Sequence, residues 1–330
     1  MIVGDAQFKY KVIGGWGELP KGWAFGDVVG IATDSRDNVY VFNRSPHPVI
    51  VFDRQGRFLA SWGENLFNRP HGITVGSDDT LFLTDEYAHI VFKCTKDGDV
   101  LMTLGTKNHP SDTGYDGVDY RTIQRPGGPF NRPTKVALSP SGEIYISDGY
   151  GNCQIHKFDP KGKYLFSWGE PGNGPGQFQI PHGICVDDQD IVYVADRENQ
   201  RIQIFTSDGE YISQWRNIRR PNDLYFSQSG YIFVASMFAI RSVADVENQS
   251  SRDPQNEVHP SYVSIWSLNG ERIVMWGGEK ACAPGNFWAA HGLCLDSHGD
   301  LYVGEIVTKP GRGPAPPECR ALQKFKRLPK

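Results

Sequence analysis

The chain of 330 residues repeats one pattern six times, and this repetition limits the possible folds more than any other feature. Each unit contains short apolar segments separated by turns rich in Asp, Ser and Gly, as in GIATDSRDNVYVFNRSPHPVIVFDRQGRFLASWG from Gly30. The later units begin at His71, Thr134, His182, Asn222 and His291. A spacing of about 40 residues is the length of one four-stranded propeller blade. We therefore predict an all-β chain that folds as a six-bladed β-propeller.

The sixth unit is incomplete because it offers only three strands. Its missing fourth strand should resemble the segments YLFSWG and RIVMWG that end other units. The N-terminal segment YKVIGGWG, from Tyr10 to Gly17, matches this pattern. We predict that this segment pairs into the last blade, so that residues 1–330 form a single closed propeller domain.

Composition excludes several classes of protein. The 37 Gly and 22 Pro residues indicate many tight turns, and 39% hydrophobic residues suffice for a core. No apolar run is long enough for a transmembrane helix, and the start MIVGDAQFKYK lacks the pattern of a signal peptide. The net charge is −4 and no basic block occurs. We therefore expect a soluble protein without a nucleic-acid or membrane partner, and we leave its oligomeric state open.

The cysteines bear on the cellular compartment. They form no CxxC pair, and several replace small apolar residues within strand patterns. Such residues are typical of reduced thiols in a core, which predicts a cytoplasmic location. The six residues are Cys94, Cys153, Cys185, Cys282, Cys294 and Cys319.

Three long insertions interrupt loops that are otherwise short: residues 106–131, 238–260 and 307–318. Because consecutive strands of a blade alternate in direction, all three insertions should lie on the face where the innermost strands begin. Long loops that gather over one mouth of a rigid scaffold often carry function. We predict that this face holds the active site, with tolerated surface insertions as the alternative.

Three histidines occupy the start of the innermost strand in alternate blades. They are His71 in blade two, His182 in blade four and His291 in blade six. Alternate blades of a six-fold ring are related by about 120°, so the three imidazoles should converge on the channel axis. Three neutral histidines with an open fourth position suit catalytic zinc, and imidazole also suits other transition metals. The alternative is a recurring turn residue without a ligand role.

Polar residues that follow the second strand of each blade should face the same mouth. Arg44 and Arg197 offer bidentate donors for a substrate carboxylate, or they pair with carboxylates of neighbouring blades such as Glu86. Tyr150 is a candidate general acid or base, or simply an aromatic residue at the rim. For Asp148 and Asp196, turn capping is the favoured interpretation.

Several of these motifs carry a family resemblance. The segments FNRPTKVALSPSGEIYISDGYGNCQIHKF, GPGQFQIPHGICV and VYVADRENQRIQIF resemble the NHL-repeat propeller of peptidyl-α-hydroxyglycine α-amidating lyase. The resemblance implies that His71, His182 and His291 bind zinc. It also implies that Arg44 and Arg197 hold the substrate carboxylate and that Tyr150 acts as the base. The family reaction splits a carbinolamide, N–CH(OH)–COO⁻, into an amide and glyoxylate.

Three departures from the family pattern change the expected site. Gly292 stands where the family has an aspartate that supports a structural calcium, so the resemblance gives calcium no ligand here. Ala289 replaces a methionine, and Gly151 replaces a disulfide cysteine.

The leading hypothesis is a metal-dependent lyase that acts on a small α-hydroxy or carbinolamide-type carboxylate. A metal-dependent hydrolase or hydratase at the same three histidines is the second hypothesis, with Glu86 as general base and an ester, lactone or unsaturated acid as substrate. The third is a non-catalytic NHL binding propeller. The tryptophans that end the units, together with Trp16 in the same slot of the closing strand, indicate blade packing rather than ligand stacking.

Overall fold

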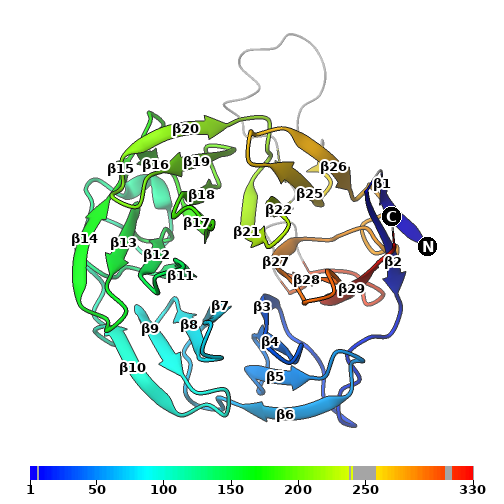
Figure 1. Ribbon diagram of the computed structural model, residues 1–330. Coiled ribbons are helices and arrows are strands. Elements are labelled where there is room, and N and C mark those ends of the chain that lie inside the picture. The colour runs from blue at the N-terminus through cyan, green and yellow to red at the C-terminus, as the bar shows by residue number, and fades with distance from the viewer. Residues whose placement is uncertain (6, 238, 241–257, 309–313, 330) are drawn as a thin grey trace.

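A computed structural model of the chain describes residues 1–5, 7–237, 239–240, 258–308 and 314–329. Six antiparallel sheets are arranged around a central channel, which confirms the predicted six-bladed β-propeller (Figure 1). Within the described parts of the chain, no helix has the length and apolar character required to span a membrane.

Each blade contains four strands that lie side by side in order from the channel to the outer surface, and blade six has a fifth. Blade one contains β3 (Val28–Thr33), β4 (Val39–Asn43), β5 (Val49–Phe52) and β6 (Phe58–Trp62). Blade two contains β7 (Pro70–Val75), β8 (Leu81–Asp85), β9 (Ile90–Cys94) and β10 (Val100–Gly105). Blade three contains β11 (Pro133–Leu138), β12 (Ile144–Asp148), β13 (Gln154–Phe158) and β14 (Tyr164–Trp168). Blade four contains β17 (Pro181–Val186), β18 (Val192–Asp196), β19 (Arg201–Phe205) and β20 (Tyr211–Trp215). Blade five contains β21 (Pro221–Ser227), β22 (Tyr231–Ser236), β25 (Tyr262–Ser267) and β26 (Arg272–Trp276). Blade six contains β27 (Ala290–Leu295), β28 (Leu301–Glu305), β29 (Leu322–Arg327) and β2 (Phe8–Ile13).

The N-terminal strand β2 pairs antiparallel with β29, with Tyr10 opposite Arg327 and Ile13 opposite Lys324. The last blade therefore contains both ends of the chain (Figure 1). A further strand, β1 (Ile2–Asp5), pairs with the outer side of β2 and gives this blade five strands. The repeat pattern contains no signal for this extra strand.

The strand sequences follow from how the blades stack. The second strands β4, β8, β12, β18 and β28 are buried along their whole length, because a neighbouring blade covers each of their faces. Their sequences are accordingly almost continuous runs of apolar residues. The outermost strands, such as β6 and β20, are exposed over most of their length.

Tryptophans at the ends of the outermost strands pack against the next blade. A Cβ atom added to Gly98 would lie 2.9 Å from the Trp62 ring, so only a glycine lets this turn approach the indole so closely. A Cβ atom added to Gly56 would likewise lie 3.0 Å from the Trp16 ring. Trp16 lies beyond the end of β2, yet its ring fills the slot that the repeat predicts. The prediction of blade packing for these tryptophans is therefore confirmed.

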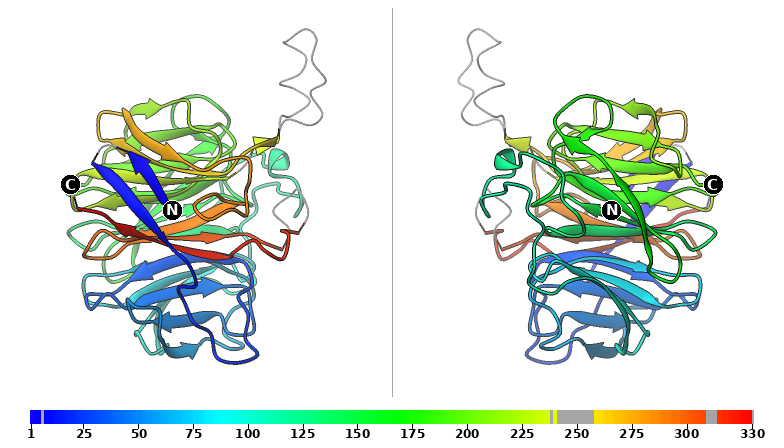
Figure 2. Two further views of the ribbon diagram at one scale, coloured as in Figure 1. Left: turned by 90° about the vertical axis from the view of Figure 1, so that its right-hand side faces the viewer. Right: turned by 90° about the vertical axis from the view of Figure 1, so that its left-hand side faces the viewer.

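The insertion at residues 106–131 contains a short 3₁₀ helix, η1 (Tyr120–Thr122). It packs on blade three, where the Thr113 hydroxyl donates to the Gly151 carbonyl at 2.6 Å. Two short strands, β23 (Ala239–Ile240) and β24 (Val258–His259), pair with each other. Figure 2 shows η1 and the β23–β24 pair on the same side of the propeller. Most of the insertion 238–260, and residues 309–313 of the third insertion, lie outside the described residues.

A final pair of short strands, β15 (Glu170–Pro171) and β16 (Gln177–Phe178), lies between blades three and four.

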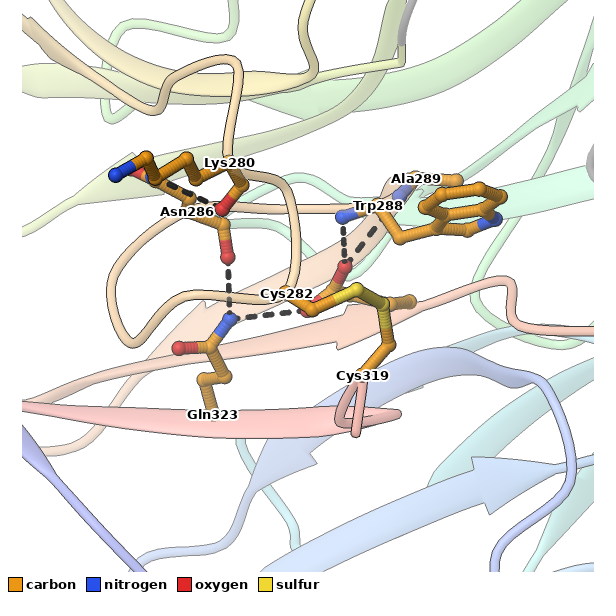
Figure 3. The surroundings of a disulfide bond; sticks show 8 residues. Lys280, Cys282, Asn286, Trp288, Ala289, Cys319 and Gln323 are labelled. Carbon is orange, nitrogen blue, oxygen red and sulfur yellow. Dashed lines mark hydrogen bonds between the residues drawn. A yellow bond between two sulfur atoms is a disulfide. The ribbon is translucent and has the colours of Figure 1, made fainter. Parts of the chain in front are cut away.

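The cysteine prediction is wrong for two residues. Cys282 and Cys319 form a disulfide across 37 residues of sequence, with Cα atoms 4.4 Å apart (Figure 3). The loop before β27 carries one cysteine and the loop before β29 carries the other, and the fold alone brings these loops together. The remaining four cysteines are free and buried, as predicted.

Candidate metal centre and active site

The three predicted histidines meet in the channel. His71, His182 and His291 lie near the starts of the innermost strands β7, β17 and β27, and each is at most 3% exposed. Their ring centroids are 4.8 to 5.0 Å apart. Their potential ligand atoms all lie within 4.8 Å of one another, and the three form the one such cluster found among the described residues.

Hydrogen bonds to the main chain fix the tautomer of each histidine. The Nδ1 atoms of His71, His182 and His291 lie 2.7 Å from the carbonyl oxygens of Thr134, Asn222 and Val29, respectively. Because a carbonyl oxygen only accepts, each Nδ1 must carry the proton and donate. Each Nε2 is therefore unprotonated and carries a lone pair, which is the state that a metal requires.

The electrostatic environment keeps the imidazoles neutral. Burial is the main cause that lowers the pKa of all three histidines well below 6.5. Nearby positive charge adds to this effect, from Arg44 at His71 and His291 and from Arg197 at all three. Three buried, neutral nitrogen ligands thus fit a divalent transition metal.

A small cavity of about 10 Å³ lies beside the histidines, just large enough for one water molecule. Asn222 is among the residues that line it and is fully buried. Neither polar atom of this amide has a hydrogen-bond partner among the described residues. An unpartnered buried amide indicates a site that accommodates a polar ligand or water.

The residues one position after the histidines, and the equivalent residues of the odd-numbered blades, do not fit a calcium ion. In this next layer of the channel, the Lys135 ammonium pairs with the Asp223 carboxylate and donates to the Leu224 carbonyl at 3.1 Å. Gly292 supplies no side-chain oxygen. An ammonium group repels a divalent cation and competes for the carboxylate, so these residues do not form a calcium site.

Tyr150 follows β12 and reaches the histidine cluster. Its hydroxyl lies 2.9 Å from His182 Nε2 and 3.2 Å from His71 Nε2. Arg197 Nη1 donates to the same hydroxyl oxygen at 3.3 Å. The hydroxyl is therefore adjacent to the point where the ligand atoms converge, as general acid–base chemistry requires.

The two predicted arginines differ in their surroundings. Arg197 is 7% exposed and uses Nε to donate to Glu198 at 2.8 Å, while Nη1 faces Tyr150. Arg44 donates from Nε to the Pro70 carbonyl and from Nη2 to Glu86, both at 3.0 Å. Arg44 thus forms the ion pair considered as an alternative, whereas Arg197 combines an ion pair with a contact inside the site.

Glu86 joins three arginines. Its carboxylate accepts from Arg44 at 3.0 Å, from Arg69 at 2.5 Å and from Arg132 at 3.0 Å. It is 1% exposed, so its charge is compensated by these guanidinium groups rather than by water. This arrangement suits an anion that organises arginines better than a general base that must take up a proton.

The aspartates that end the second strands cap loops, in agreement with the favoured interpretation. Asp148 accepts from the backbone N–H of Asn131 at 2.8 Å, and Asp196 accepts from that of Gln179 at 2.8 Å. Each bond fixes the loop that leads into an innermost strand. Burial raises the pKa of Asp196 to about 6.

The region before β27 is held by a network that includes the disulfide (Figure 3). The Glu305 carboxylate accepts from the backbone N–H groups of Trp288 at 2.6 Å and Ala289 at 3.3 Å. The Gln323 amide donates to Glu305 at 3.0 Å and to the Asn286 carbonyl at 2.8 Å. These contacts place the segment that leads directly to His291.

Comparison with known proteins extends these observations. Two segments, residues 130–158 and 178–205, match the family model described as NHL repeat. NHL repeat-containing protein 3 of Mus musculus is 33% identical over 277 residues, an alignment that covers 76% of each chain. The chain belongs to the NHL-repeat family.

This NHL propeller is also related to amidating lyases, as its motifs predicted. Peptidyl-alpha-hydroxyglycine alpha-amidating lyase 1 of Drosophila melanogaster is 30% identical over 270 residues, which cover 76% of this chain and 45% of that protein. Peptidylglycine alpha-amidating monooxygenase of Rattus norvegicus is 35% identical over 218 residues, or 56% of this chain and 21% of that protein. The NHL propeller thus aligns with less than half of the length of either relative.

Solved structures agree with the fold. A virginiamycin B lyase from Staphylococcus aureus has a TM-score of 0.59 at 13% identity and covers 97% of this chain and 100% of its own. A gluconolactonase from Xanthomonas campestris has a TM-score of 0.58 at 12% identity, with 92% and 87% covered. At such low identity, these matches support the propeller architecture alone.

Sequence reasoning missed other arginines at the site of this NHL propeller. Arg132 and Arg220 pair with Glu86 and Glu198, at 3.0 and 2.7 Å. A signal for them exists in the sequence, because an Arg-Pro step precedes the innermost strand in blades two, three and five, at Arg69, Arg132 and Arg220. In blade two the Asp85 carboxylate accepts from the backbone N–H of Arg69 at 2.9 Å, and in blade three Asp148 accepts from the N–H of Asn131, next to Arg132, at 2.8 Å.

Proposed function

We propose that this NHL propeller is a metal-dependent lyase that cleaves a small α-hydroxy or carbinolamide-type carboxylate. The observation that carries the proposal is the convergence of three Nε2 lone pairs with the Tyr150 hydroxyl, which lies 2.9 Å from His182 and 3.2 Å from His71. The relationship to proteins named as amidating lyases supports the same reaction class.

His71, His182 and His291 would hold the metal, and zinc is our first choice because three neutral histidines with an open position are typical of catalytic zinc. When bound, the metal supplies Lewis-acid chemistry. The residues of this chain supply the remaining functions of binding, orientation and proton transfer.

The proposed reaction breaks one carbon–nitrogen bond. The substrate hydroxyl loses its proton, its oxygen forms a carbonyl with the same carbon, and the electron pair of the broken bond leaves with the nitrogen, which is protonated. Amide and glyoxylate result, and water is not consumed. Tyr150 would carry the proton, and two contacts of its hydroxyl support this role: it lies at the histidine cluster and Arg197 donates to it.

The substrate carboxylate would bind to the guanidinium groups of Arg197 and Arg44. Arg197 is our first candidate, because it is buried and already faces the Tyr150 hydroxyl. Arg44 is the second, with Glu86 holding its guanidinium in place. Bidentate hydrogen bonds from arginine match a carboxylate in geometry and charge.

The test combines metal analysis with product analysis. Purified protein should contain transition metal and should convert an N-acyl-α-hydroxyglycine into equal amounts of amide and glyoxylate, with activity lost on chelation. A metalloprotein that instead adds water to an ester, lactone or unsaturated acid would support the hydrolase or hydratase alternative. A protein that takes up no metal, even on reconstitution, would support the binding-propeller alternative.

The disulfide bears on the compartment. Bonds such as Cys282–Cys319 persist in oxidising environments and are rare in the cytosol. The cytoplasmic location expected from the sequence depends on reduced thiols, and these two cysteines argue against it. We therefore propose that the protein works in an oxidising compartment.

A further inference from the structure

Guanidinium groups and phenol rings alternate in a row that leads from the rim into the histidine cluster. In order, the row contains Arg69, Tyr87, Arg132, Tyr150 and Arg197. The distances from guanidinium carbon to neighbouring ring centroid are 5.0, 4.9, 5.1 and 5.3 Å along the row. All four are within the range of cation–π attraction. Tyr87, the second member of the row, is 49% exposed, whereas Tyr150 lies against the histidines.

Arg132 stands at the centre of this row and is firmly anchored. Its Nη2 donates to Glu86 at 3.0 Å and its Nη1 to the Tyr115 hydroxyl at 2.8 Å. Its backbone N–H donates to His89 Nδ1 at 3.1 Å. Its φ angle of +68° lies in the left-handed region, as do those of Ile180 and Arg220 at the same position before the innermost strands of blades four and five.

Tyr150 contacts Arg132 through its ring and through its main chain. Its ring lies between the guanidinium groups of Arg132 and Arg197, and its backbone N–H points to the Arg132 carbonyl at 3.5 Å. Arg197 also bonds to the Tyr150 hydroxyl, but Arg132 contacts only the ring face and the main chain. Arg132 is thus placed to hold the ring without touching the reacting atoms.

We propose that Arg132 is a positioning residue that holds the Tyr150 ring so that its hydroxyl stays at the histidine cluster. The proposal rests on the proposed lyase function for its consequence on turnover. The placement of the ring itself does not depend on which reaction the site performs. Small errors in the position of a catalytic group are costly, on the order of a hundredfold in rate for a displacement near 1 Å.

The kinetic test compares Arg132→Met with Arg69→Met. Arg69 contacts Glu86 and Tyr87 from the outer end of the row and does not reach Tyr150, so it is a matched control. We expect Arg132→Met to lower kcat roughly a hundredfold with little change in KM and in metal content, and Arg69→Met to change kcat by less than about threefold. Arg132→Lys keeps the charge but loses the planar face, and we expect an intermediate kcat.

A second readout needs no activity. In protein labelled with fluorotyrosine, the ¹⁹F resonance of Tyr150 is assigned by its absence in Tyr150→Phe. We expect this resonance to shift or broaden in Arg132→Met and Arg132→Lys and to stay unchanged in Arg69→Met. An unchanged Tyr150 resonance in both Arg132 variants would overturn the proposal, as would an effect on KM alone. If the wild type shows no lyase activity, the function fails while the ¹⁹F comparison still tests the positioning.

Discussion

Even-numbered and odd-numbered blades fill the same position of the innermost strand with different chemistry. Blades two, four and six place a histidine there, whereas blades one, three and five place Val29, Thr134 and Asn222. Each histidine Nδ1 donates to the main-chain carbonyl of the odd blade that follows it around the ring. The candidate ligand set therefore needs all six blades, because the even blades supply the nitrogens and the odd blades orient them.

The largest expected effect is a loss of bound metal, which should follow a substitution in an even-numbered blade and not the matched substitution in an odd-numbered blade. We expect His182→Ala to lose the bound metal, about one equivalent in the wild type, because two histidines bind a transition metal far more weakly than three. Asn222→Ala is the matched change in the next blade, and it should retain the metal because its carbonyl remains. Elemental analysis of both purified variants checks this. Retention of metal by His182→Ala would contradict the three-histidine site.

The second prediction concerns Tyr150, which follows a strand of blade three and contacts the histidines of blades two and four. Tyr150→Phe removes only the hydroxyl, so we expect metal content to be unchanged and kcat to fall about 10²- to 10⁴-fold, the usual contribution of a general acid or base. Glyoxylate release and elemental analysis measure the two quantities on the same sample. Full activity of the variant would remove Tyr150 from the proposed mechanism.

The third prediction distinguishes blade six from the other even blades. Pro70 and Pro181 precede His71 and His182, but Ala290 precedes His291, and the loop before it is held by the Cys282–Cys319 disulfide. Replacing both cysteines by alanine should lower the free energy of unfolding by about 2–4 kcal/mol. Denaturant unfolding measures the loss. Reductant should destabilise the wild type similarly and leave the double variant unaffected; equal stability of all samples would contradict the prediction.

The smallest expected effect is a pH dependence. In the folded protein without metal, burial holds the pKa of each histidine well below 6.5, so the unfolded chain binds more protons as pH falls below 6.5. Stability should therefore decrease with falling pH, by up to about 1.4 kcal/mol per pH unit for each histidine. His182→Asn introduces the residue of the next blade and should reduce this slope. Chemical unfolding of metal-free protein between pH 7 and pH 5.5 measures it, and identical slopes would contradict the assignment.

Much of the site could be predicted from the sequence because the repeat converts sequence position into angular position. His71, His182 and His291 share one place in the unit, so their convergence followed from counting blades. The tautomers could not be predicted in this way, because they depend on carbonyl groups that any residue carries. Arg132 was missed for a similar reason, because its proposed positioning role depends on the turn that brings its guanidinium group against the Tyr150 ring and not on its residue type.

The disulfide shows where such reasoning stops. Cys282 and Cys319 lie in two loops of blade six that are separated by two strands, and no spacing rule links them. Glu86 presents the same limit, because it pairs with three arginines from different loops, and no spacing in the sequence links them.

The sequence by itself determined the six-fold repeat, the residues of the inner ring and the family to which the chain belongs. These are properties of the local pattern, because each unit must form the same kind of strands to bury its apolar residues. Only the tertiary structure decided which histidine nitrogen is free, which carboxylate each arginine pairs with and which cysteines meet. These features depend on distances between loops that are far apart in sequence, and closure of the ring sets those distances.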